Sequence, residues 1–144
     1  MGSKVGRSHN TRQNDVGKLR VGCVNQHLTN KRKRREFLRI MEHWVDVDIC
    51  GVVESWLKEG DKILDEELKD SELQWLGKDR KGRNGGGIGF LIRKRLEAQK
   101  LQSSSENLLW VCIKGQLFIG VVYLIPGDTS GVNEETLQEL QQDI

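Results

Sequence analysis

Two polar side chains each follow an apolar, β-like segment and are the first candidates for chemistry. Asn25 follows the apolar run 19–24, and Glu54 follows the longer apolar run 47–53. A carboxylate at the end of a strand suits a hard divalent cation, which prefers oxygen ligands, and an amide can orient a phosphate or a metal-bound water. Each residue also has a plainer interpretation: Glu54 as a solvated strand end and Asn25 as a turn residue. Their relative placement therefore decides their importance.

An amphipathic helix is predicted between these two segments, over residues 31–45. Its apolar positions follow the 3.6-residue period and are Phe37, Leu38, Met41, Trp44 and Val45. Thr29 or Asn30 can cap its first turn. Strand, helix and strand in this order predict a βαβ unit with adjacent, parallel strands. We therefore expect Asn25 and Glu54 to emerge at the same edge of a sheet, where α/β proteins commonly bind ligands.

The rest of the chain is predicted to be mainly β-structure. Strands are expected at 73–77, 88–93, 109–113 and 117–123, the last two forming a hairpin, with a charged loop or short helix in 58–72 and a final helix at 136–143. The glycines at 85–87 indicate a turn, because they lack the G-x-x-x-x-G-K-[ST] spacing of a phosphate loop. Residues 1–17 are predicted to be a disordered leader, followed by one domain over 18–144.

Charge is unevenly distributed along the chain. The net charge of +2 combines +8 over residues 1–44 with −6 over the remainder. Five consecutive basic residues open the predicted helix: Lys31, Arg32, Lys33, Arg34 and Arg35. They predict contact with a nucleic-acid backbone, although a solvated helix face or a localisation signal has the same pattern. With no apolar run long enough for a membrane helix or a signal peptide, an intracellular location, nuclear or cytoplasmic, is expected.

The cysteines and histidines do not indicate a metal site. Cys23, Cys50 and Cys112 lie in apolar runs without C-x-x-C spacing, so we interpret them as reduced core residues. His27 and His43 have no partner at metal-ligand spacing. Zinc and a disulfide framework are therefore not expected.

Four segments together resemble the N-terminal portion of the endonuclease/exonuclease/phosphatase (DNase I-like) superfamily, most closely the endonuclease domains of non-LTR retrotransposons. The segments are RVGCVNQ, DICGVVESWL, GRNGGGIGFLIRK and LFIGVVYLIPGD. The resemblance implies a partial four-layer α-β-β-α sandwich and a nuclease-type hydrolase that uses Mg²⁺ or Mn²⁺ to cleave phosphodiesters, with DNA as the expected partner. It implies that Glu54 is a metal ligand, that Asn25 positions the metal and the scissile phosphate, and that Tyr123 contacts the phosphate. From the residues alone, Tyr123 is an interfacial aromatic residue with a hydrated hydroxyl.

The catalytic Asp, Asn and His motifs of the second half of that family have no counterpart before Ile144. We therefore expect a truncated domain that binds metal weakly or not at all and is inactive alone. An apolar sheet face is expected to be bare unless the missing half or another chain covers it. The alternative is a non-catalytic module that binds nucleic acid or protein through the basic helix and the exposed sheet. A phosphatase or lipid-phosphate branch of the family is a third reading.

Overall fold

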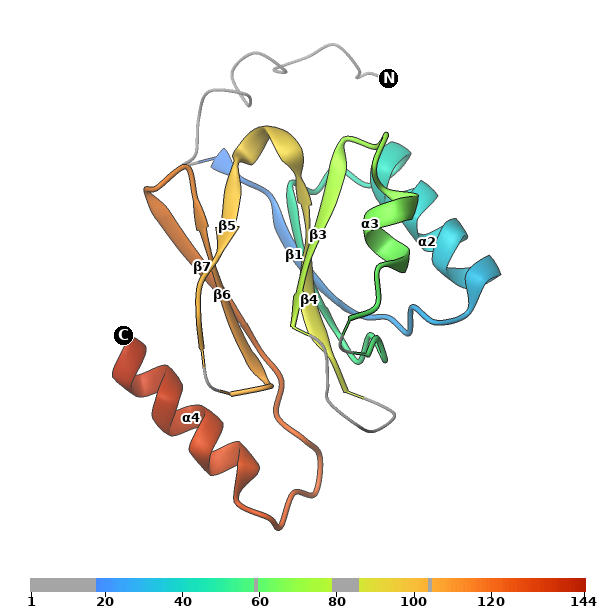
Figure 1. Ribbon diagram of the computed structural model, residues 1–144. Helices are drawn as coiled ribbons and strands as arrows, with labels where there is room; N and C mark the ends of the chain where they lie inside the picture. The colour runs from blue at the N-terminus through green and yellow to red at the C-terminus, as the bar shows by residue number, and fades with distance from the viewer. Residues whose placement is uncertain (1–17, 59, 79–85, 104) are drawn as a thin grey trace.

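The structure is a computed structural model that describes residues 18–58, 60–78, 86–103 and 105–144 (Figure 1). It is a mixed α/β protein whose described residues form two β-sheets and three α-helices. The predicted leader, residues 1–17, lies outside the described residues. So does the segment 79–85 that precedes the last two glycines of the predicted turn.

The first sheet has the strand order β1-β2-β4-β3 and contains the predicted βαβ unit. Its strands are β1 (Val21–Asn25), β2 (Ile49–Val53), β3 (Leu73–Lys78) and β4 (Ile88–Arg93). Helix α2 (Lys31–His43) connects β1 to β2, which pair in parallel with Asn25 opposite Val53. The prediction of adjacent parallel strands is therefore confirmed, and β2 is an interior strand buried on both faces.

The second sheet is antiparallel and has the order β5-β6-β7. Its strands are β5 (Ala98–Lys100), β6 (Leu108–Ile113) and β7 (Leu117–Val122), and β6 and β7 form the predicted hairpin. The 3-10 helix η2 (Lys94–Leu96) leads from β4 into β5. Strand β5 was not predicted because its sequence, Ala-Gln-Lys, has neither β-branched residues nor an apolar alternation.

The sheets pack face to face around one apolar core, and helices lie outside them (Figure 1). That core includes Ile49, Ile88, Phe90, Ile92, Leu96, Leu109, Val111, Ile113 and Val121. A second core cluster joins the other face of the first sheet to α2 and α3 (Ile63–Glu67). Helix α4 (Val132–Asp143) is bound to the second sheet, where the Trp110 indole N–H donates to Asp143 over 2.9 Å.

The expected bare apolar face is found in part, on the outside of the second sheet. Phe118 is 57% exposed and Val122 is 37% exposed. They alternate along β7 with Val121, which faces the core between the sheets. None of the helices in the described part of the chain combines the length and the apolar character that crossing a membrane requires.

Two predictions about the core are wrong in detail. Trp44 is 75% exposed because it caps the carboxyl end of α2, outside the buried stripe that contains Leu38 and Met41. Cys23 is exposed because β1 is an edge strand of the first sheet, whereas Cys50, on the interior strand β2, is buried. Burial, together with the nearby Cys23, raises the pKa of the Cys50 thiol to about 11, so this cysteine is a packing residue and not a nucleophile.

Candidate functional site

Asn25 and Glu54 lie at the same edge of the first sheet. Asn25 is the last residue of β1 and is paired with Val53, and Glu54 directly follows Val53. Neighbouring strands are about 4.8 Å apart, so both backbones leave the sheet side by side. The pairing extends beyond the strands, because the Gln26 N–H donates to the Val53 carbonyl over 3.1 Å. We call the loops at this edge, residues 25–29 and 54–57, the carboxyl rim.

The Glu54 carboxylate is fixed by two neutral donors. Its Oε1 accepts the Gly86 N–H over 2.7 Å, and its Oε2 accepts the Tyr123 hydroxyl over 2.6 Å. Glu54 itself has a left-handed backbone, with φ 57°. The strand therefore delivers this residue to the rim, but contacts from the turn before β4 and from the residue after β7 orient its side chain. Since a carboxylate has about four acceptor sites, two bonds leave others available for a ligand.

Tyr123 connects the second sheet to the rim. It follows β7, its backbone N–H donates to the Asn107 carbonyl over 2.9 Å, and its hydroxyl reaches Glu54. The phenol of Tyr123 therefore lies beside the same edge of the first sheet as Glu54. Its hydroxyl is committed to a carboxylate, in contrast to the hydrated group expected from the residues alone.

The glycine turn before β4 has a structural role and also forms part of the site. Gly87 has φ +84°, and a Cβ added there would lie 2.5 Å from the Ser55 hydroxyl oxygen. Ser55 is fully buried, so it has little room to move away. The Ser55 N–H donates to the Gly87 carbonyl over 3.0 Å, and the Trp56 N–H donates to the Gly86 carbonyl over 2.8 Å. This close approach explains the glycines. It also places the Gly86 N–H against Glu54, a role that spacing alone did not reveal.

An aromatic pair beside Glu54 was also missed. The rings of His27 and Trp56 have centroids 4.3 Å apart and are tilted by 38°. The sequence offered His27 only as a possible metal ligand, and Trp56 only as part of the segment DICGVVESWL. A tryptophan two residues after a strand-end carboxylate was the available signal, but its partner lies in the loop that follows β1.

The basic run divides into buried and exposed members. Arg34 is 5% exposed, and its guanidinium bonds Glu67 over 2.7 Å and the Leu28 carbonyl over 3.1 Å. Arg34 is thus part of the fold and is not available to a nucleic-acid backbone. The exposed members are Lys31, Arg32, Lys33 and Arg35. Helix α2 is capped by Asn30, whose side chain accepts the Lys33 N–H over 2.9 Å. Because α2 begins directly after the carboxyl rim, its exposed cations lie on the same side of the molecule as the rim (Figure 1).

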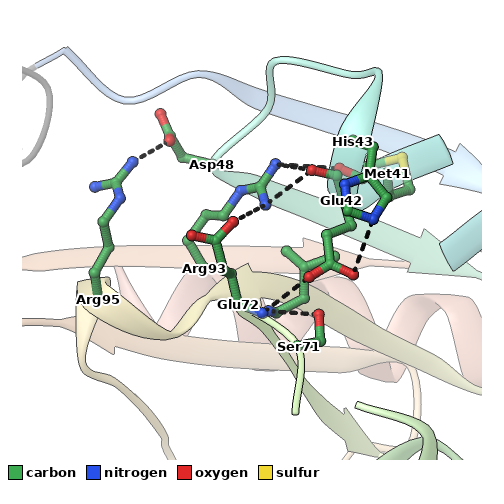
Figure 2. A network of polar contacts seen from close by, with 9 residues as sticks. Met41, Glu42, His43, Asp48, Ser71, Glu72, Arg93 and Arg95 are labelled. Carbon is green, nitrogen blue, oxygen red and sulfur yellow. Dashed lines mark hydrogen bonds and ion pairs between the residues drawn. The ribbon is translucent and has the colours of Figure 1, made fainter. Parts of the chain in front are cut away.

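The opposite end of β2 holds a contrasting set of charges. Asp48, just before β2, is 1% exposed; its Oδ2 accepts the Arg20 N–H over 3.0 Å, and its Oδ1 pairs with the Arg95 guanidinium over 2.6 Å. Figure 2 shows Arg95 reaching Asp48 from the segment that follows β4. This carboxylate is therefore neutralised inside the fold.

Arg93 extends that arrangement to α2 (Figure 2). Its guanidinium donates to the Met41 carbonyl over 3.1 Å and to the Glu42 carbonyl over 3.4 Å, at the helix end where a positive charge is favourable. The Glu42 carboxylate in turn accepts the Glu72 N–H over 3.1 Å. We call Asp48, Arg95, Arg93, Glu42 and Glu72 the amino-end network.

The donors at the carboxyl rim fit a weakly held hard cation. Glu54 offers a carboxylate and Asn25 an amide oxygen, the ligand types that Mg²⁺ prefers, and Mg²⁺ commonly uses one or two carboxylates together with water and substrate phosphate. Within the described ranges, no group of three or more His, Cys, Asp or Glu side chains is placed to hold a metal. A cation here would therefore complete its coordination with water and with oxygen atoms of a bound phosphate.

Comparisons with known proteins add no relative: no protein-family model matches the chain, and no curated protein matches it significantly.

Proposed function

We propose that the carboxyl rim is the metal- and phosphate-binding part of a Mg²⁺-dependent phosphodiesterase of the endonuclease type, with DNA as its substrate. The observation that carries the proposal is the fixed Glu54 carboxylate, held by Gly86 and Tyr123 at the edge where β1 delivers Asn25. A carboxylate that merely ended a strand would not need two donors from distant parts of the chain to orient it. The proposal agrees with the resemblance of the four sequence segments to the DNase I-like superfamily.

The proposal includes a partial four-layer DNase I-like sandwich. Two features support it: the two sheets pack face to face, and helices lie outside both. In such an architecture, residues that follow strands of both sheets can converge at one rim. Glu54 from the first sheet and Tyr123 from the second are one such pair.

Each residue has a distinct task in this proposal. Glu54 holds the cation, Asn25 orients the phosphate beside it, and Tyr123 keeps the carboxylate in place next to the ligand. A bound Mg²⁺ would polarise a phosphoryl oxygen and stabilise the negative charge that develops during hydrolysis.

We further propose that the 144-residue chain binds without measurable turnover. Among the described residues, no cluster of acidic or histidine ligands is assembled around Glu54. A positioned general base contributes about 10²–10⁴-fold to such reactions, and the proposal assigns none of the described residues to that role, so hydrolysis should be very slow. Mg²⁺-dependent nicking of plasmid DNA by the pure protein, abolished in Glu54→Gln, would show that this part of the proposal is wrong.

The central test measures binding of a fluorescent DNA duplex by anisotropy, with Mg²⁺ or Mn²⁺ and then with EDTA. We expect the cation to strengthen binding by the wild-type chain and to have no effect on Glu54→Gln. Glu72→Gln is the matched control, because it makes the same chemical change on a carboxylate that is 81% exposed at the other end of the sheet. Equal loss in both variants, or no cation effect in the wild type, would refute the metal site.

The alternative is a non-catalytic binding module. The exposed cations at the start of α2, where the first turn contains no acidic residue, favour nucleic acid as its partner. Binding would then weaken steeply with salt, with a slope of about 0.9 per neutralised phosphate on duplex DNA. If binding has this slope and ignores both EDTA and Glu54→Gln, the module is the correct interpretation. Docking of a protein on Phe118 and Val122 would instead be independent of salt.

A further inference from the structure

The aromatic pair at the carboxyl rim is more exposed than its packing requires. Trp56 is 39% exposed and His27 is exposed, although their rings lie only 4.3 Å apart. Trp56 follows Glu54 by two positions, so a ligand held at Glu54 would have neighbouring groups within reach of this pair. Ser55 and Leu57, the residues on either side of Trp56, are buried and point inward.

Both rings are attached to a rigid base. The Leu28 N–H donates to the Ser55 carbonyl over 2.9 Å, which ties the loop that carries His27 to the loop that carries Trp56. The Thr29 hydroxyl lies 2.8 Å from His27 Nε2 and holds the imidazole ring. The Trp56 N–H bonds the Gly86 carbonyl over 2.8 Å. A ligand would therefore meet a preformed aromatic surface and would not need to order it.

The backbone of Trp56 is strained, with φ 64°, as is that of Glu54, with φ 57°. Glycine adopts this left-handed region without cost, whereas a bulky residue loses about 1 kcal/mol or more there. A turn that required only the backbone shape would be more stable with glycine at position 56. The strain and the exposed indole together indicate that the side chain has a use.

We propose that Trp56 and His27 form a stacking platform for a nucleobase of the nucleic acid whose phosphate binds at Glu54 and Asn25. This inference rests on the proposed function and specifies the substrate as an unpaired or frayed strand, since a base must leave its stack to reach the rings. An aromatic side chain stacks on any base through its π-face, so the platform favours nucleic acid over other phosphodiesters without selecting a sequence.

The test compares two ligands that have the same phosphates. One is a thymidine strand of about 12 nucleotides, and the other is a strand of equal length in which every base is replaced by an abasic tetrahydrofuran. Binding is measured in EDTA, so that metal binding at Glu54 does not contribute. We expect the wild-type chain to bind the thymidine strand about tenfold more tightly, and Trp56→Ala to lose this preference while binding the abasic strand unchanged.

Three further variants make the outcome decisive. Trp44→Ala removes a tryptophan that is 75% exposed at the far end of α2 and should leave the preference intact. Trp56→Gly removes the ring and relieves the backbone strain, so it should fold even if Trp56→Ala does not. His27→Ala should reduce the preference in part, because it removes the support for the indole.

The inference is overturned if the wild-type chain has no preference, if Trp56→Gly retains it, or if Trp44→Ala abolishes it as well. A change of oligomeric state in Trp56→Gly without loss of base preference would assign the pair to a protein contact and would also overturn it. The two proposals fail separately: Glu54→Gln should lose the cation effect on duplex binding but keep the base preference. Cation dependence without a base preference would refute only the platform.

Discussion

The two ends of strand β2 both carry a carboxylate, but the structure treats them in opposite ways. At the amino end, Asp48 is 1% exposed and is neutralised by Arg95. At the carboxyl end, Glu54 is only half-buried, and the two donors that hold it, Gly86 and Tyr123, are uncharged. The amino-end network thus resolves its charge within the fold, whereas the carboxyl rim keeps a negative charge open to solvent.

The backbone differs in the same way. At the carboxyl rim, Glu54 and Trp56 occupy the left-handed region, which bulky residues normally avoid. Asp48 has no such conformation, and its neighbours Arg20 and Arg93 are linked to it through backbone hydrogen bonds. Strain and unneutralised charge at one end of a strand, with neither at the other, distinguish the proposed binding site from a structural anchor. Four substitutions test whether the two ends of β2 differ in this way.

The largest effect is expected from Asp48→Ala. The substitution leaves the Arg95 guanidinium and the Arg20 N–H without their partner, and loss of one side of a buried ion pair costs about 3–5 kcal/mol of unfolding free energy. Urea denaturation measures this loss. Asp48→Asn is the control, because it can still accept the Arg20 N–H and should be less damaging. A loss below about 1 kcal/mol would mean that the amino end is no anchor.

Tyr123→Phe should have the second largest effect. It removes the hydroxyl that donates to Glu54, and a hydrogen bond to a charged group contributes about 1.5–3 kcal/mol, with the lower value expected for this half-buried pair. A double-mutant cycle with Glu54→Ala isolates the coupling, because alanine cannot accept the hydroxyl. If the two losses simply add, the bond does not join the sheets energetically.

A smaller, pH-dependent effect is expected from Glu42→Gln in the amino-end network. Burial raises the pKa of Glu42. Hydrogen bonds from Ser71 and the Glu72 backbone, together with the charges of His43 and Arg93, lower the pKa by more than burial raises it, so it lies below its ordinary 4.5. A lowered carboxylate pKa stabilises the fold above pH 4.5, and this contribution is lost as the pH falls through the folded-state pKa.

At pH 7, Glu42→Gln should therefore reduce the unfolding free energy by less than about 1 kcal/mol, because solvent screens the interactions of the Glu42 carboxylate with its neighbours. The difference from wild type should shrink as the pH approaches 3, in urea denaturation at each pH. Glu72→Gln, on an exposed side chain, should show no difference at either pH. A cost that is constant with pH would exclude the ionised carboxylate as its source.

The smallest change in stability is expected from Glu54→Gln, at about 0.5 kcal/mol. The glutamine carbonyl can accept the Gly86 N–H, and its amide can donate to the Tyr123 oxygen, so both contacts are preserved in reversed or equal form. Urea denaturation beside Asp48→Ala gives the direct comparison. A loss as large as that of Asp48→Ala would make Glu54 a structural residue and remove the distinction between the two ends.

Much of the fold could be predicted because its signals are local. The parallel pair β1 and β2, helix α2 and the hairpin of β6 and β7 all follow from periodicity and turn residues within short windows. Predictions failed where tertiary position overrides a local pattern. Trp44 fits the apolar period yet lies past the helix end, and Arg34 belongs to a basic run yet is buried against Glu67, on α3.

The candidate site was predictable only in part, for the same reason. The strand ends place Asn25 and Glu54 together, but the donors to Glu54 are 32 residues away at Gly86 and 69 residues away at Tyr123. The His27–Trp56 pair likewise depends on the registration of two loops across the sheet. No spacing rule within one segment encodes such contacts. The strand ends identified Asn25 and Glu54 and the family resemblance added Tyr123, but the Gly86 donor and the His27–Trp56 pair were missed.

The bond between Tyr123 and Glu54 has a thermodynamic consequence. It is a polar contact between two sheets that meet mainly through apolar side chains, and its acceptor, Glu54, is also the proposed ligand-binding group. A ligand that binds the Glu54 carboxylate must either leave its hydrogen bond from Tyr123 in place or displace the Tyr123 hydroxyl. By linkage, a ligand that leaves this bond intact would raise the melting temperature of the two-sheet structure. A ligand that breaks the bond would bind more weakly, because part of its binding free energy would offset the lost bond. Ligand binding at the carboxyl rim can therefore be followed through the change in melting temperature.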